Sequence, residues 1–582
     1  MTLGSWRDRI PEKVKGLAGV CVLCVLIVAL VLLSGYLSGL VHAPPANATV
    51  HVQLLEVNDF HGHMAAGQIM NNRPVGSAPV LASYLKAAMA SGNADGTIIA
   101  LPGDVIGSAP PVSGLLMDEP SMLFFNSFAN QYCTIGSNSP SASCNMVATL
   151  GNQEFDNGVP EVLRMINGGN GGSNITHIVD PYPGAKIDYV SSNVVWTANN
   201  TTVLPPYTLR TVDGVTIAFI GADTIKTPTL TTSANVANLT FQDEADSINR
   251  HIPEIQAKGV HAIVVLLHEG GTQVPYEGPT QENATMQNNG RVVDIVSRLD
   301  PAVDVVLSAH THEFTNIYLP DSTGKLVLVT QAYMYGRGYG DIDLTIDRST
   351  GEIVGKSAQI VPTYADQAPG TSLDPAATAL LSKAQNAVNP VEDQVIGTAA
   401  ENITIAQNSA GESAMGDLVA DEERATMKTD VAFDTSGDVF ANISKGTITW
   451  MDLYNVQPNS GTLMAMTMSG AQIRQTLEQQ WQAPLPTSNL VVSGLSYTWD
   501  AAQPAGSKVT SVSVNGVPLN PNATYTVATV DTVTLGYDGY TTFMQGGNMS
   551  YGPTDIDALV SYVGSLPQPV NVTVDGRIHR VN

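Results

Sequence analysis

The sequence predicts an α/β fold in at least two domains, and three observations support this. Short apolar runs alternate with helical segments from residue 50 to about 362, the βαβ pattern of a mostly parallel sheet. Several of these apolar runs end in Asp, Asn or His side chains. At 582 residues, the chain is longer than one hydrophobic core usually fills.

Strands of the first domain, residues 50–362, are expected at short continuous apolar runs, because a parallel strand is buried on both faces. The runs lie at 53–57, 98–101, 262–267 and 304–307. Helices are expected at 78–90, 241–258 and 290–299.

The composition changes after residue 362, where residues 363–395 are rich in Ala, Pro, Asp and Gln. Residues 373–388 predict a linker helix with Pro near its start. A second, smaller domain is expected at 396–582. Its helices are predicted at 414–427 and 470–480, and strand-rich sequence follows at 490–498, 509–514 and 525–530.

The N-terminus combines a basic flank, residues 1–15, with an uncharged apolar run, residues 16–41. A secretory core needs ~7–15 apolar residues and a membrane span ~20, so a transmembrane signal-anchor is expected. The positive-inside rule then places everything after residue 44 outside the cytoplasm, tethered to the cell membrane by one span. Cleavage near Ala43, followed by secretion, is the alternative.

Cysteine usage and charge agree with export. Cys133 and Cys144 flank a loop of Gly, Ser, Asn and Pro, which suits a disulfide in an oxidising compartment; two free thiols are the alternative. The net charge of −26 disfavours nucleic acid and anionic membrane surfaces as partners. Contact with the membrane is therefore expected only through the apolar segment at 16–41. No protein partner is predicted.

Metal-type ligands follow the predicted strands. We expect ligands from separate parts of one sheet to converge, because sites in open α/β sheets lie beyond the carboxyl ends of the strands. The candidates are Asp59, His61, Asp104, Asn152, His268, His310 and His312. Carboxylate, amide and imidazole donors suit two divalent cations such as zinc, manganese, cobalt or iron. Any one histidine alone could be an ordinary surface or core residue, but their co-occurrence favours ligation.

Such a pair of cations, ~3.5–4 Å apart, would lower the pKa of a bridging water, so that a metal-bridged hydroxide becomes the nucleophile. The same cations neutralise phosphoryl oxygens. The ligand set therefore predicts hydrolysis of phosphate esters.

Four segments resemble the calcineurin-like metallophosphoesterase signature: Asn-Asp-Phe-His-Gly-His at 58–63, Gly-Asp-Val at 103–105, Gly-Asn-Gln-Glu-Phe-Asp-Asn-Gly at 151–158 and Ala-His-Thr-His at 309–312. The resemblance is closest to the exported 5'-nucleotidase/UDP-sugar hydrolase family. Segments 412–421, 468–474, 492–498 and 525–540 resemble its second domain. The resemblance implies a four-layer α/β/β/α sandwich, a smaller α/β substrate domain, and small-molecule nucleotides or other phosphate esters as substrates.

The resemblance also implies roles for single residues. One metal would be held by Asp59, His61, Asp104 and His312, and the other by Asp104, Asn152, His268 and His310. Gln153 stands where the family has its catalytic His, and Asp156, the partner of that His, is retained. Because Gln cannot deliver a proton, a loss of ~10²–10⁴-fold in rate is expected unless His63 or Glu154 substitutes. A helix cap is the alternative role for Asp156.

The substrate half departs further from the family. Asn459 and Thr532 stand at the positions of its two stacking aromatics, Ser409 and Phe440 at those of its arginines, and Thr435 at that of an Asn. The loss of the stacking faces should weaken selection of nucleosides, since stacking contributes ~1–3 kcal/mol per base.

Four residues remain as predicted substrate contacts: Asp538, Ser493, Gly494 and Phe440. A turn residue is the alternative role for Asp538. Two alternatives to a nucleotide hydrolase follow. One is a metal-retaining surface binding protein with weak or no turnover, and the other is a hydrolase of a non-nucleotide phosphate ester.

Overall fold

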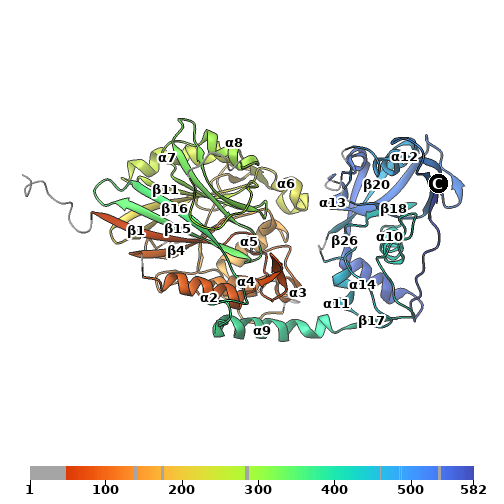
Figure 1. The fold of residues 1–582 in the computed structure, drawn as a ribbon, viewed down its shortest axis with the longest axis horizontal. Coiled ribbons are helices and arrows are strands. Elements are labelled where there is room, and N and C mark those ends of the chain that lie inside the picture. Colours follow the sequence, from red (N-terminus) through yellow and green to blue (C-terminus); the bar gives the residue numbers. More distant parts are fainter. Residues whose placement is uncertain are drawn as a thin grey trace, which may run out of the picture.

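The computed structural model describes residues 48–582 apart from 93, 137–140, 172–175, 282–287, 459–460, 484, 487, 535 and 537–538. The chain forms two lobes, the first coloured red to green and the second blue, with helix α9 (Pro375–Glu392) running from one toward the other (Figure 1). Among the residues that the structure describes, none of the helices has both the length and the apolar character that a membrane span requires. The signal-anchor predicted at 16–41 lies outside these residues.

Two six-stranded sheets build the first lobe. One has the order β16-β15-β1-β4-β5-β6, in which neighbours from β1 to β6 are parallel. Its strands are β1 (Thr49–Glu56), β4 (Gly96–Leu101), β5 (Met146–Thr149), β6 (Asp188–Val190), β15 (Gly338–Asp347) and β16 (Ile353–Pro362). The other has the order β13-β14-β12-β11-β9-β8, with antiparallel strands only at its two edges. Its strands are β8 (Tyr207–Val212), β9 (Val215–Asp223), β11 (Ala262–His268), β12 (Val305–Ser308), β13 (Phe314–Pro320) and β14 (Leu326–Ala332).

Three hydrophobic cores order these layers. Leu54 and Ile98 of the first sheet share one core with Phe219 and Val264 of the second, so the sheets pack face to face. The outer face of the first sheet packs against α2 (Ala78–Met89), α4 (Glu119–Asn126), α5 (Val159–Asn167) and α9. The outer face of the second packs against α7 (Glu244–Ala257) and α8 (Arg291–Arg298). The layer order is therefore α/β/β/α.

The four predicted strands are confirmed as β1, β4, β11 and β12, and the helix predicted at 78–90 is confirmed as α2. The helix predicted at 241–258 begins later, at Glu244. The Asp243 carboxylate accepts the backbone N–H of Asp246 and caps α7, while Leu239–Phe241 form strand β10. The predicted linker helix is α9, which begins after Asp374 because that side chain caps two backbone N–H groups.

The second lobe contains a five-stranded sheet, β21-β18-β25-β20-β26, and a four-stranded one, β24-β23-β22-β27. In the first, β18 is Val431–Thr435, β20 is Thr462–Ser469, β25 is Thr524–Val530 and β26 is Gly547–Thr554. In the second, β23 is Val509–Val514, β24 is Val517–Pro518 and β27 is Ile578–Val581. The run predicted at 490–498 divides at Gly494, whose φ is 72°, into β21 (Leu490–Ser493) and β22 (Leu495–Asp500), one in each sheet. The main helices of the second lobe are α10 (Ala414–Met427), α11 (Trp450–Val456), α12 (Gly470–Gln479) and α14 (Asp555–Ser565). In the first lobe, Cys133 and Cys144 form the predicted disulfide.

Candidate metal centre

The predicted ligands meet at the carboxyl ends of parallel strands from both sheets. Asp59 and His61 follow β1, Asp104 follows β4, and Asn152 follows β5. His268 is the last residue of β11, and His310 and His312 follow β12. The expectation that one sheet supplies every ligand is therefore wrong. The strand ends of two packed sheets open on the same edge of the sandwich, and each sheet contributes part of the set.

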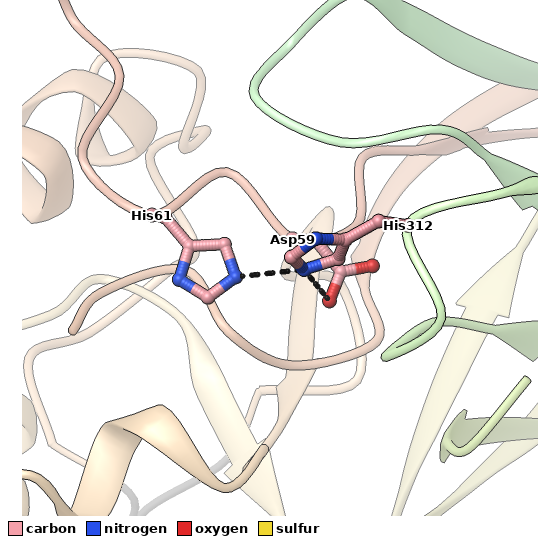
Figure 2. Close-up of side chains that lie close together, drawn as sticks. All are labelled: Asp59, His61 and His312. Carbon is pink, nitrogen blue, oxygen red and sulfur yellow. Dashed lines mark hydrogen bonds and ion pairs between the residues drawn. The ribbon is translucent and has the colours of Figure 1, made fainter. Parts of the chain in front are cut away.

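One cluster consists of Asp59, His61 and His312, whose donor atoms all lie within 4.8 Å of one another (Figure 2). His61 Nε2 lies 3.2 Å from His312 Nε2, and His312 Nε2 lies 3.7 Å from Asp59 Oδ1. Asp59 is fully buried, whereas the His312 side chain is 32% exposed. The cluster is therefore reached from solvent on the His312 side.

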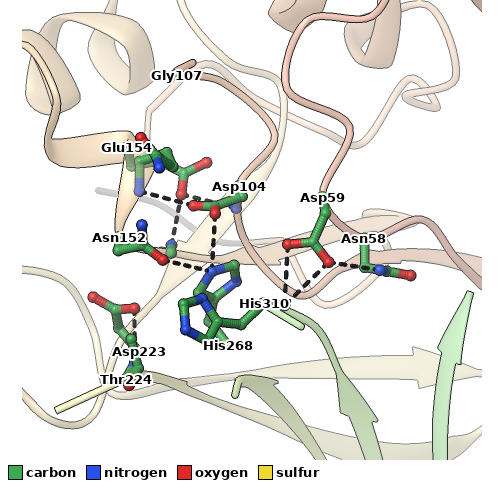
Figure 3. Close-up of polar contacts among 12 residues, drawn as sticks. Asn58, Asp59, Asp104, Gly107, Asn152, Glu154, Asp223, Thr224, His268 and His310 are labelled. Atoms are coloured by element: carbon green, nitrogen blue, oxygen red, sulfur yellow. Dashed lines mark hydrogen bonds and ion pairs between the residues drawn. The ribbon is translucent and has the colours of Figure 1, made fainter. Parts of the chain in front are cut away.

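The second cluster consists of Asp104, His268 and His310, again with donor atoms within 4.8 Å (Figure 3). His268 Nε2 lies 3.0 Å from Asp104 Oδ2 and 3.2 Å from Asn152 Oδ1. His61 Nε2 of the first cluster lies 3.5 Å from the same Asp104 oxygen. The Asp104 carboxylate thus lies between the two clusters, where one oxygen faces donors of both.

Hydrogen bonds orient the donor atoms. His61 Nδ1 lies 2.9 Å from the Gly107 carbonyl oxygen, and His268 Nδ1 lies 3.0 Å from that of Pro102. A carbonyl can only accept, so in each ring Nδ1–H donates and Nε2 is the nitrogen that faces the cluster. Asn58 Nδ2 donates to Asp59 Oδ2 at 2.7 Å and fixes that carboxylate in the same way.

Backbone strain concentrates at the ligands. Five of them have a left-handed φ: Asp59 (48°), His61 (46°), Asp104 (48°), His310 (73°) and His312 (61°). Non-glycine residues rarely adopt this conformation, and the strain characteristically collects at functional sites. Gly151 leaves room for the donors, because a Cβ there would come within 2.3 Å of Asp104 Oδ1.

The electrostatics fit cation binding. Burial lowers the pKa of His61 and His312, and that of His310 to about 3, so these rings are neutral and able to ligate at neutral pH. Burial opposes ionisation of Asp104, but the charge and hydrogen bond of His268 outweigh it and lower the pKa of the carboxyl. Burial lowers and Asp104 raises the pKa of His268, and Asp104 prevails. A bound cation would replace the proton that Asp104 favours on His268, and neutral imidazoles around carboxylates are the donor set that zinc, manganese, iron and cobalt take.

The side chains of Gln153 and Asp156 are hydrogen-bonded to each other. In the orientation that satisfies both of its amide atoms, Gln153 donates to Asp156 Oδ2 at 2.6 Å and Oδ1 at 2.9 Å, and to Ser108 Oγ at 2.9 Å. The Gln153 backbone N–H donates to Asp104 Oδ1 at 2.9 Å. Both amide hydrogens are therefore used on the protein's own acceptors.

Glu154 and His63, the two residues that could replace a catalytic histidine, have other contacts. Glu154 Oε2 accepts from the backbone of Asp104 at 2.9 Å and of Gly151 at 2.6 Å, so the side chain holds the ligand loops in place. The His63 ring stacks on Tyr335 with centroids 3.6 Å apart. The Tyr335 ring lies 5.6 Å from those of His61 and His312; sequence reasoning missed it, since no local pattern sets it apart.

The predicted substrate residues are more dispersed. Ser493 Oγ donates to Asp421 Oδ1 at 2.6 Å, Gly494 forms the turn between β21 and β22, and Phe440 is 50% exposed. Asp538 lies outside the described residues. Their roles in substrate binding stay predictions, and the structure brings none of the first three to the metal centre.

Several known proteins are similar to this chain over most of its length. Residues 395–545 match the family described as the 5'-nucleotidase C-terminal domain. Endonuclease YhcR of Bacillus subtilis is 32% identical over 538 residues, 91% of this chain, although the chain spans only 41% of that relative. Cell wall protein Lmo0130 of Listeria monocytogenes is 31% identical, covering 90% of this chain and 68% of the relative. The structure of a 5'-nucleotidase precursor from Thermus thermophilus superposes with a TM-score of 0.59 at 25% identity, covering 91% of this chain and 99% of that one. The chain therefore belongs to the 5'-nucleotidase family.

Proposed function

We propose that this protein is a phosphoesterase that uses two divalent cations to hydrolyse nucleotides or other phosphate esters. The observation that carries the proposal is the position of Asp104. One oxygen of its carboxylate lies 3.0 Å from His268 Nε2 and 3.5 Å from His61 Nε2, which suits a ligand shared between two cations.

The residues present fit that pair of cations. Asp59, His61 and His312 with Asp104 would hold one; Asn152, His268 and His310 with Asp104 would hold the other. When bound, the cations would supply Lewis-acid stabilisation of the phosphoryl group and a more acidic attacking water.

The chain's own residues define what remains of catalysis. Gln153 carries no titratable proton, and its amide is occupied by Asp156 and Ser108. The Gln153 amide therefore cannot protonate the leaving alcohol. Esters of acidic alcohols, which leave readily as anions, should react faster than esters of ordinary alcohols.

A substrate panel tests the proposal. The full chain, purified in detergent and loaded with manganese, zinc or cobalt, should hydrolyse p-nitrophenyl phosphate, AMP or UDP-glucose. Metal content measured by plasma mass spectrometry should approach two ions per chain. Asp343→Asn, an exposed change outside the metal centre, is the matched control. A chain that binds no transition metal would contradict the proposal.

A surface binding protein with weak or no turnover is the second candidate. It is favoured because the Gln153 amide is already hydrogen-bonded to Asp156 and Ser108. Bound metal without turnover of any ester in the panel would support this candidate. A hydrolase of a non-nucleotide ester is the third, favoured by turnover of p-nitrophenyl phosphate alone. The relatives' names, an endonuclease, a cell wall protein and a 5'-nucleotidase, do not agree on one substrate.

We also propose that the enzyme acts outside the cytoplasm, tethered by residues 16–41. Support comes from the basic flank before that run and from the disulfide between Cys133 and Cys144, a bond typical of oxidising compartments. Fractionation of expressing cells, with protease added to intact cells, would test this location.

A further inference from the structure

A cleft of about 390 Å³ lies between the two lobes, and we call it the interlobe cleft. Gln153 and Asp156 line it from the first lobe, and Trp450, Tyr454 and Thr532 line it from the second. Gln153 also donates its backbone N–H to Asp104 Oδ1 at 2.9 Å. Gln153 therefore both lines the cleft and contacts a candidate metal ligand, so the cleft adjoins the candidate metal centre.

The acidic and basic side chains that line the cleft, among the described residues, are all acidic. Asp118, Asp531 and Asp557 contribute carboxyl groups, Asp156 adds one whose pKa is raised well above its usual range by burial and then by Asp104, and none of the described residues that line the cleft is Lys, Arg or His. Asp118 is only 5% exposed. Its Oδ2 accepts from the Gly107 backbone at 2.9 Å, while its Oδ1 has no hydrogen-bond partner among the described residues. If a phosphate ester carried another anionic group besides its phosphate, the cleft would repel that group, whereas it would attract a cationic group.

Two aromatic rings line the same cleft. Trp450 and Tyr454, one turn apart on α11, stack with ring centroids 5.4 Å apart and an interplanar angle of 16°. Aromatic faces beside carboxylates form the usual protein environment for alkylammonium groups, because the ring quadrupole and the carboxylate both attract positive charge. Neither feature favours phosphate or carboxylate groups.

We propose that the interlobe cleft receives the alcohol part of the substrate and selects an alcohol with a positive charge, so that the substrates are phosphate monoesters of aminoalcohols. This inference rests on the proposed phosphoesterase function. In the reaction, water oxygen bonds to phosphorus as the P–O bond to the alcohol breaks, and the alcohol oxygen takes a proton from solvent. The products are the aminoalcohol and inorganic phosphate.

Three small esters that differ mainly in the charge of the alcohol provide the test. With the manganese-loaded full chain, kcat/KM should fall from phosphoethanolamine to glycerol 1-phosphate to 3-phosphoglycerate. The cationic and anionic alcohols should differ by about tenfold or more. Binding of the same esters should follow the same order in thermal-shift titrations, which need no turnover.

Two variants connect this order to the cleft. Asp557→Asn, at an exposed position, and Asp531→Asn should each reduce the ratio of kcat/KM for phosphoethanolamine to kcat/KM for 3-phosphoglycerate several-fold. Asp343→Asn, exposed on β15 away from the cleft, should preserve the full preference.

Each outcome has one meaning. Turnover of p-nitrophenyl phosphate with no charge order, or with 3-phosphoglycerate preferred, overturns the inference and keeps the phosphoesterase. A charge order that both cleft variants leave unchanged also overturns it. If no ester is hydrolysed, the proposed function fails, and the thermal-shift order alone decides whether the cleft prefers the cationic ester.

Discussion

His268 Nε2 lies 3.0 Å from Asp104 Oδ2, and this contact connects the second sheet of the sandwich to the first. Asp104 follows β4 and His268 ends β11, so the candidate metal centre exists only where the two sheets pack together. Cation binding and the mutual position of the sheets should therefore depend on each other.

Removing the shared carboxylate should abolish the centre. Asp104→Asn keeps the size of the side chain but removes the charge that both histidine clusters face. Changes to groups that merely orient ligands cost roughly 10–100-fold in metal affinity or activity, so loss of this ligand should exceed about 100-fold. Metal content and kcat/KM for p-nitrophenyl phosphate measure it, with Asp343→Asn as control. Two ions still bound to Asp104→Asn would show that the carboxylate is not shared.

Restoring a histidine should restore acid catalysis. Gln153→His would place an imidazole beside Asp156, which already lies within 2.9 Å of the Gln153 amide. The expected gain in kcat is about 10²–10⁴-fold, and it should be largest for esters of weakly acidic alcohols. A series of aryl and alkyl phosphates measures this dependence. Asp156→Asn in the same background should reverse the gain, and an unchanged kcat would mean that Gln153 is not the limiting feature.

A single methyl group should disturb the ligands. A Cβ on residue 151 would come within 2.3 Å of Asp104 Oδ1 and 2.6 Å of His268 Cε1, so Gly151→Ala must displace one of them. Metal titration followed by calorimetry should show weaker binding by tenfold or more, on the order of an orienting-group change. Gly564→Ala in α14, whose new Cβ would meet Ile396 at an ordinary 3.8 Å, is the matched control. Equal affinities for the two variants would exclude close packing at residue 151 as the cause.

Buried acids in the second lobe should make stability fall as pH rises. Glu423 is fully buried, neither carboxylate oxygen has a hydrogen-bond partner among the described residues, and burial followed by the charge of Asp434 raises its pKa well above 4.5. A carboxyl whose pKa is raised by folding leaves stability unchanged below its unfolded pKa and lowers stability progressively as pH rises from the unfolded value toward the folded one. The urea midpoint should therefore be lower at about pH 8 than at about pH 5.

Glu423→Gln isolates this contribution. The amide is isosteric and uncharged, so the variant should lose less stability than the wild type between the two pH values. Glu352→Gln, at an exposed position, should behave like the wild type. The explanation by Glu423 fails if its Gln variant retains the full pH dependence.

Much of the fold follows from local sequence. The apolar runs at 98–101 and 262–267 become strands because burial on both faces demands continuous hydrophobicity, and Asp374 starts α9 because its side chain caps free backbone N–H groups. The helix predicted from residue 241 begins at Glu244 because strand pairing of β10 with β7 (Val194–Trp196) takes the preceding residues. That pairing is not local, so no window of the sequence reveals it.

The sequence by itself determined which donors stand at the strand ends: Asp59, His61, Asp104 and Asn152 in one half, and His268, His310 and His312 in the other. Only the tertiary structure decided that these halves belong to two sheets, that Asp104 lies between both clusters, and that Asp156 and Ser108 occupy the Gln153 amide. The physical reason is the sequence distance over which the two kinds of interaction act. Strand propensity and ligand chemistry are properties of neighbouring residues, whereas the approach of β4 to β11 depends on the core that their sheets share.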